Sequence, residues 1–266
     1  MTGAALVLLL AAPPAWIFYA FDNAAGRGKL PFDKQVEIVR AAGYPGIGYE
    51  GVQDLPDALA ALDAAGLKMY STYISVNLSS PDVEKWREGI AQLRGRGTLI
   101  LLALTGKPED IPARGVEVVR AIAGMARESN LKVAIYPHHA FAIAHFREAI
   151  ALAGQLAIPN VGVAFNLCHW LRERDPVAVE ERIRQAGAGL FAVSINGADA
   201  DGADWSRLIQ PLDSGSYDLT TLLRALKSSG YSGPMGLQGY GVPGDSLTNL
   251  RRSLSAWRSL QAASRF

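Results

Sequence analysis

Eight short apolar segments recur along the chain, and stretches of helical periodicity separate them. The segments are Ile17–Phe21, Gly46–Tyr49, Lys68–Ile74, Thr98–Leu104, Lys132–Tyr136, Val161–Phe165, Leu190–Ile195 and Pro234–Gln238. A continuous apolar run of this length is typical of a parallel strand that is buried on both faces. Strands that alternate with helices form βαβ units. Eight such units predict an α/β fold, a single (β/α)8 TIM barrel.

Helix start and stop signals lie between the apolar segments. Ser80-Pro81 and Asp175-Pro176 each place an N-cap side chain before a proline, which suits the first position of a helix. Gly43 and Gly66 follow helical segments, where a left-handed residue ends a helix. The competing fold is an open doubly wound sheet, but the sequence lacks the glycine fingerprint of a dinucleotide site. These signals favour the barrel.

Residues 1–15 are set apart from the barrel pattern. Ala4–Ala12 is an uncharged apolar run followed by two prolines, similar to the core of a secretory signal, although no Lys or Arg precedes it. A signal peptide would give a periplasmic or secreted protein, and an N-terminal extension would leave the protein cytoplasmic. The run is too short to span a bilayer, so we expect no membrane partner. Residues 16–266 are predicted to form one TIM-barrel domain.

The charge balance and the cysteine count exclude several classes of protein. The chain has 26 Lys and Arg against 25 Asp and Glu, a formal net charge of +1. No basic surplus is available to neutralise a phosphate backbone, so we expect no nucleic-acid partner. The single cysteine, Cys168, rules out an intrachain disulfide and a multi-cysteine zinc site. The oligomeric state does not follow from the sequence.

Polar side chains stand at the ends of the predicted strands, where barrel enzymes carry their active sites. The residues that we expect to bind substrate are Asp22, Tyr73, Asn166, Asn196 and Gln238. Amides hydrogen-bond sugar hydroxyls in both directions, and an aromatic ring offers an apolar face to a sugar ring. The long irregular stretch Gly197–Tyr217 would lie on the same face, and long loops are usually functional. This set predicts a carbohydrate site.

Three residues are candidates for proton transfer: Glu50, His138 and His169. Burial of Glu50 at the end of a strand would raise its pKa, although a solvated loop position is the alternative. Adjacent residues at a strand end point to opposite sides, so we expect His138 in the pocket and His139 against a neighbouring helix. Asn166 and His169 lie three residues apart in a turn and converge. We expect His145, inside the next helix, and the buried Cys168 to be structural.

With these residues in place, the chain resembles the xylose-isomerase-like TIM-barrel superfamily of sugar isomerases and epimerases. The resemblance rests on Gly43–Ile47, Val161–His169, Leu212–Asp218 and Gly230–Pro234. It implies a TIM barrel with a carbohydrate pocket. Family members carry a D-x-x-H motif after strand six and a glutamate at the end of strand eight. This chain has Asn166-Leu167-Cys168-His169 and Gln238 at those places.

The same resemblance implies a divalent metal held by acidic and histidine ligands from strands five to eight. Here those positions carry His138, Asn166, Ser194 and Gln238, and none of them is a carboxylate. Mg²⁺ and Mn²⁺ prefer hard, anionic oxygen ligands. We therefore predict no metal ligands and no cofactor for this chain. A softer metal, held weakly by the histidines and the amides, is the alternative.

The predicted function is that of a carbohydrate-active TIM-barrel enzyme, a sugar isomerase or epimerase acting on a small-molecule sugar or sugar derivative. Glu50 or His138 would abstract a proton next to a carbonyl, and His169 would act as the acid. A lyase or hydrolase acting on a keto-sugar or glycoside is one alternative. A catalytically inactive sugar-binding barrel is another. The neutral strand ends and the charge balance argue against the DNA-repair branch of the superfamily.

Overall fold

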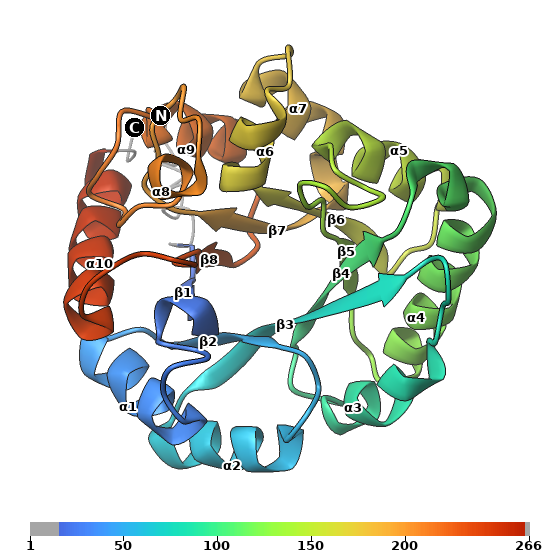
Figure 1. Cartoon of the computed structure of the whole chain (residues 1–266), viewed down its shortest axis with the longest axis horizontal. Helices are drawn as coiled ribbons and strands as arrows, with labels where there is room; N and C mark the ends of the chain where they lie inside the picture. The colour runs from blue at the N-terminus through green and yellow to red at the C-terminus, as the bar shows by residue number, and fades with distance from the viewer. Residues whose placement is uncertain (1–15, 264–266) are drawn as a thin grey trace, which may run out of the picture.

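Eight parallel strands close into a barrel in the computed structural model, which describes residues 16–263 (Figure 1). They are β1 (Phe18–Phe21), β2 (Gly46–Glu50), β3 (Lys68–Asn77), β4 (Leu99–Thr105), β5 (Val133–Ile135), β6 (Val161–Asn166), β7 (Leu190–Ile195) and β8 (Met235–Leu237). Pairing of Phe18 with Met235 joins β1 to β8 and closes the sheet. The predicted (β/α)8 fold is confirmed.

Helices surround the strands as an outer ring (Figure 1). They are α1 (Phe32–Ala42), α2 (Leu55–Ala65), α3 (Arg87–Gln92), α4 (Val116–Glu128), α5 (Phe146–Leu156), α6 (Leu167–Glu173), α7 (Val179–Ala186), α8 (Trp205–Leu208), α9 (Leu219–Ser228) and α10 (Ser246–Ala263). Short 3-10 turns lie at Asp22–Ala24, Glu84–Trp86, Pro108–Asp110 and Gly187–Gly189, and a π-helical turn at Ile111–Gly115 leads into α4. The short helix α6 follows β6 directly, and α8 lies in the loop between β7 and α9, so both come after the carboxyl ends of their strands.

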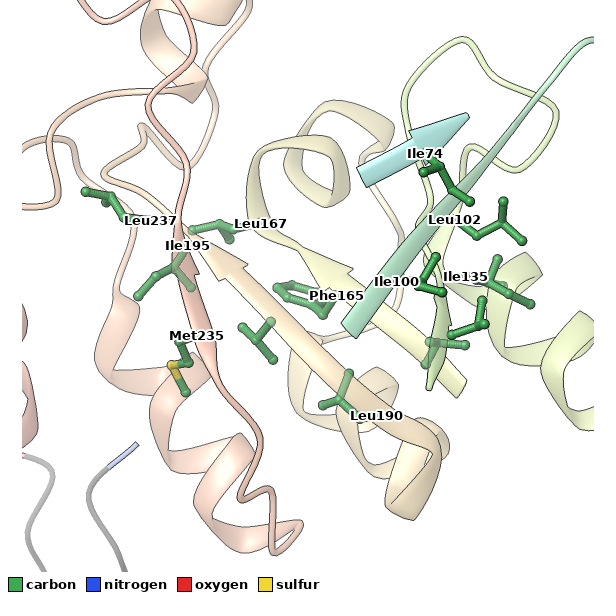
Figure 2. Close-up of a cluster of buried hydrophobic side chains, with 14 of the residues drawn as sticks. Ile74, Ile100, Leu102, Ile135, Phe165, Leu167, Leu190, Ile195, Met235 and Leu237 are labelled. Atoms are coloured by element: carbon green, nitrogen blue, oxygen red, sulfur yellow. The ribbon is translucent and has the colours of Figure 1, made fainter. Parts of the chain in front are cut away.

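Two layers of buried side chains hold the barrel together. Between the strands and the helices, aliphatic side chains such as Ile100, Leu102 and Ile135 form the larger core (Figure 2). The space inside the barrel holds aromatic side chains, among them Tyr19 and Phe21. Both layers are apolar because each strand is covered on its two faces, and this explains why the strands are continuous apolar runs in the sequence.

Helix ends follow the predictions at the glycines but not at the prolines. Gly43 and Gly66 end α1 and α2 with φ of 90° and 69°. The predicted start at Ser80 is wrong, because α3 begins only at Arg87 after a 3-10 turn. The predicted start at Asp175 is also wrong. Its carboxylate bonds the guanidinium of Arg182 at 2.9 Å instead of capping the first turn of α7.

Two strand lengths differ from the prediction in ways that shape the site. β3 runs to Asn77 instead of ending at Ile74, so Tyr73 lies within the strand and not at its end. β5 has three residues, and Tyr136 follows it as extended chain whose N–H donates to the carbonyl of Leu102.

Within residues 16–263, no helix is long and apolar enough to cross a membrane. The signal-peptide expectation concerns residues 1–15, outside the described part of the chain.

Candidate active site

A cavity of about 570 Å³ opens at the carboxyl ends of the strands. Of the eight predicted site residues, six line it: Asp22, Glu50, Tyr73, His138, His169 and Gln238. Asn166 and Asn196 are not among the residues that line it. Glu50 and Tyr73 belong to β2 and β3, and the other four residues follow β1, β5, β6 and β8. Residues distant in sequence share one space because parallel strands end at the same face.

One wall of the cavity carries two carboxylates joined by an arginine. Arg27 Nε lies 3.2 Å from Asp22 Oδ1, and its terminal nitrogen pairs with Glu50. The main-chain N–H of Glu50 donates to Asp22 Oδ2 at 2.8 Å. Asp22 is almost fully buried, and this burial raises its pKa to about 6 although Arg27 opposes the shift. Its carboxyl group therefore titrates near neutral pH. The Glu50 side chain is 43% exposed, so the buried carboxyl on this wall is Asp22.

The opposite wall carries two adjacent imidazoles, tilted by 44° to each other, whose tautomers are fixed by the main chain of His139. The rings of His138 and His169 lie with centroids 3.9 Å apart. His138 Nδ1 lies 2.8 Å from the carbonyl oxygen of His139, and a carbonyl only accepts, so Nδ1 carries the hydrogen. The His139 N–H donates to His169 Nδ1 at 3.3 Å, so the neutral ring carries its hydrogen on Nε2. One ring therefore has a free Nε2 lone pair and the other an Nε2–H donor.

Burial keeps both of these rings uncharged at neutral pH. It lowers the pKa of His138, and it lowers the pKa of His169 well below the usual range, with the neighbouring histidines adding to the effect. Desolvation penalises the charged form of an imidazole, so each ring remains available as a neutral base or donor.

His139 contacts a neighbouring helix, as predicted, and it also lines the cavity. Its Nδ1 lies 2.5 Å from Oε1 of Glu173 on α6, and it lines the cavity beside His138. Glu173 additionally approaches His145 Nε2 at 3.4 Å. His145 was predicted to lie inside a helix, and it is instead the N-cap of α5. The sequence interpretation missed Glu173, although its position four residues after His169 places both on one face of α6.

The two asparagines serve the scaffold. Asn166 Oδ1 accepts from the Cys168 thiol at 3.1 Å and from the His169 N–H at 3.5 Å, and its amide nitrogen donates to the Tyr136 hydroxyl. Asn196 donates to the carbonyls of Gly197 and Leu208, both at 2.7 Å, and so holds the loop after β7. Both amide nitrogens donate inside the protein, and neither asparagine lines the cavity.

Aromatic side chains form the remainder of the cavity. Tyr73 packs edge-on against Tyr136, and burial raises the pKa of both hydroxyls, so both remain protonated. Trp205, from the long loop predicted to face the site, lies 5.4 Å from the His169 ring and 5.6 Å from the His139 ring. Tyr240 stands at the rim with 62% of its surface exposed. These rings offer the apolar faces that carbohydrate binding uses.

The family's divalent metal does not fit these residues. Within residues 16–263, no three His, Cys, Asp or Glu side chains are arranged to hold a metal ion. The amide of Asn166 is committed to Tyr136 and to the start of α6, and Gln238 Oε1 accepts from the N–H of Gly239 at 3.1 Å. Neutral amides that already bond inside the protein are poor ligands for a hard cation.

Solved structures with the same fold cover nearly the whole chain. The IOLI protein with a bound zinc atom gives a TM-score of 0.75 at 16% identity, over 94% of this chain and 99% of that one. The 3-keto-D-glucoside 4-epimerase YcjR from E. coli gives 0.75 at 14%, over 92% and 100%. An L-ribulose 3-epimerase gives 0.74 at 15%, over 95% and 96%. At these identities the likeness extends to the fold alone. No curated protein matches the chain by sequence.

A family model described as xylose isomerase-like TIM barrel matches residues 36–260. The match begins within α1 and ends within α10, so it includes seven of the eight strands and most of the cavity wall. It agrees with the closed eight-stranded barrel and with the resemblance carried by the strand-end motifs. The chain belongs to the xylose isomerase-like TIM-barrel family.

Proposed function

We propose that this protein is a sugar epimerase that moves a proton at the carbon next to a carbonyl, using side chains in place of a metal ion. The complementary tautomers of His138 and His169 carry most weight for this function, because they place a free base and a hydrogen-bond donor side by side. Structures of the same fold are named as a 3-keto-D-glucoside 4-epimerase and an L-ribulose 3-epimerase, which supports the same class of substrate.

The first step removes the proton. His138 Nε2 takes the hydrogen from the carbon beside the carbonyl, and the electron pair of that C–H bond moves to the carbonyl oxygen to give an enolate. The Nε2–H of His169 donates to this oxygen. Such a donor is most effective where negative charge develops in a site with little water. The low pKa of His138 keeps it unprotonated and ready as a base at neutral pH.

The second step uses the opposite wall. β1 and β5 are four strands apart in a closed ring of eight, so Asp22 and His138 face each other across the cavity. Asp22 in its protonated form delivers a proton to the far side of the same carbon, which inverts that carbon and restores the carbonyl. Exchange with solvent then returns His138 and Asp22 to their starting forms. Glu50, through its pair with Arg27, orients this wall.

Proton NMR in D2O tests the proposal. We expect a ketose or keto-sugar to lose its α-proton signal and give the epimer, and we expect this exchange to survive a chelator. His138→Ala should slow the exchange by about 100-fold or more, the usual contribution of a general base. Glu181→Gln is the control, because Glu181 lies outside the cavity lining and pairs with Arg184. Exchange that stops with chelator, or that is unchanged in His138→Ala, would contradict the mechanism.

A further inference from the structure

A second cavity of about 620 Å³ adjoins the candidate active site. It lies between the loop after β1, the loop after β8 and the start of α10. Asn23, Arg27, Gln238 and Tyr240 line both cavities, so the two spaces meet at these residues. Asn23 Oδ1 accepts from the Gly239 N–H at 3.0 Å, which ties the two loops together at the junction. The boundary between the two cavities is therefore fixed by this hydrogen bond.

The second cavity gathers exposed apolar side chains. Within residues 16–263, the large hydrophobic side chains that stand exposed are Ile17, Leu30 and Tyr240. Leu30 and Tyr240 both line the second cavity, at 38% and 62% exposure, and Val242 lies beside them. Exposed apolar surface that is concentrated in one hollow marks a binding site more often than scattered positions do.

The charges in the two cavities argue against a phosphorylated ligand. The positive side chains that line them are Arg27 and Lys29, and the negative ones are Asp22, Glu50 and Asp245. Arg27 is already paired with both carboxylates of the active-site wall. Asp245 caps α10, since its carboxylate accepts from the Thr248 N–H at 2.8 Å, and it places a negative charge where a phosphate would need a donor. A neutral ligand fits this balance better than an anion.

We propose that the substrate is a neutral glycoside with a ketone on its sugar ring, whose reacting sugar lies in the candidate active site and whose ring-shaped aglycone lies in the second cavity against Tyr240 and Leu30. This inference rests on the proposed function for the placement of the reacting sugar. A free monosaccharide would leave the apolar wall of the second cavity in water, whereas a ring attached through the glycosidic oxygen covers it. Tyr240, at the junction, offers its face to the bond between the two rings.

Calorimetric titration with matched sugars tests this inference. The probes are D-glucose, D-galactose and D-mannose, each as the free sugar, the methyl glycoside, the phenyl glycoside and the 6-phosphate. We expect a phenyl glycoside to bind at least tenfold more tightly than its free sugar, and the 6-phosphate to bind no more tightly than the free sugar. Leu30→Ser and Tyr240→Ala should each remove most of that advantage. Leu30→Ser should leave the free sugar unaffected, since Leu30 lines only the second cavity.

Ile17→Ser is the matched control, because Ile17 is 46% exposed, between Leu30 and Tyr240, but precedes β1 at the other end of the barrel. Its affinity for every probe should equal that of the wild type. Equal affinity for free sugar and phenyl glycoside, tighter binding of the 6-phosphate, or no binding of any probe would each overturn the inference. Proton exchange in D2O is measured separately, so a glycoside preference without exchange would remove the proposed function and leave the second cavity as a glycoside site.

Discussion

At the scale of single residues, Asp22 links the stability of the protein to pH. Burial raises its pKa from an ordinary value of 3.8 to about 6, so the folded protein holds this proton more tightly than the unfolded chain does. The resulting stability is fully present below about pH 4 and is lost as the pH rises through about 6. The difference between the two pKa values corresponds to about 3 kcal/mol. Relative to wild type, Asp22→Asn should gain about that amount between pH 4 and pH 7.5 in urea unfolding.

Asp175 provides a control of opposite sign. Burial alone would raise its pKa, but hydrogen bonds from Arg182 and from the N–H of Val177, with the charge of Arg182, hold it below the usual range. Its contribution to stability is therefore present above the unfolded pKa and is lost as the pH falls. Asp175→Asn should cost more stability at pH 7.5 than at pH 3. If both variants shifted in the same direction with pH, the electrostatic account of Asp22 would be wrong.

Glu173 is predicted to act through His139. The carboxylate holds the His139 ring, and the main chain of His139 sets the tautomers of His138 and His169. Glu173→Gln removes the charge, so the His139 Nδ1 hydrogen should lose its downfield NMR signal, and α-proton exchange should fall roughly 10- to 100-fold through misplacement of the rings. Glu181→Gln, an exposed glutamate paired with Arg184, is the control and should change neither readout. An unaltered Nδ1 signal in Glu173→Gln would contradict this role.

The sequence located the strand-end residues better than it described their partners. The apolar runs end directly before Asp22 and Glu50 and two residues before His138, and the barrel then brings these residues into one cavity. The hydrogen bonding of Asn166 could not be predicted from the local sequence pattern, because its amide donates to the Tyr136 hydroxyl, thirty residues away. The spacing of Glu173 from His169 was a usable signal that the strand-end pattern did not include.

At the scale of elements, α6 depends on the residue that ends β6. Asn166 closes the first turn of this seven-residue helix and bonds Cys168 and Tyr136 as well. Asn166→Ala should therefore cost about 2–3 kcal/mol, the loss of a cap plus buried hydrogen bonds. Asp218→Ala, at the exposed N-cap of α9, should cost about 1 kcal/mol. Equal losses in chemical unfolding would mean that the buried bonds of Asn166 add nothing.

The strands were predicted well because parallel strands inside a barrel are apolar on both faces, and few other elements share that pattern. Helix starts were predicted less well. A polar residue before proline also suits an irregular turn, as at Ser80, and a buried carboxylate can serve a distant arginine, as at Asp175. Whether such a side chain caps a helix or bonds a distant residue is decided by tertiary contacts, which the local sequence does not record.

For the whole molecule, closure of the barrel is what gives the candidate site two walls. Neither the carboxylates at the carboxyl ends of β1 and β2 nor the histidines after β5 and β6 make a proton-transfer site alone. The closed ring places them across a cavity, and aromatic side chains inside the barrel support its floor. Phe21 belongs to both parts, since it packs inside the barrel and lines the cavity. Packing of the interior and shape of the site are therefore coupled.

Gly236 on β8 tests this coupling. A Cβ atom there would lie 2.5 Å from the Phe21 ring and 2.9 Å from the Tyr19 ring, so both buried rings would have to move. Gly236→Ala should cost about 2 kcal/mol by overpacking and should weaken sugar binding through Phe21. Gly124→Ala on α4 is the control, because the added Cβ meets no atom within 4 Å. This variant should gain about 0.5–1 kcal/mol of stability from helix propensity and should bind sugar as the wild type does. Urea unfolding and calorimetry measure the two effects. Loss of stability without loss of affinity in Gly236→Ala would show that the interior and the cavity are independent.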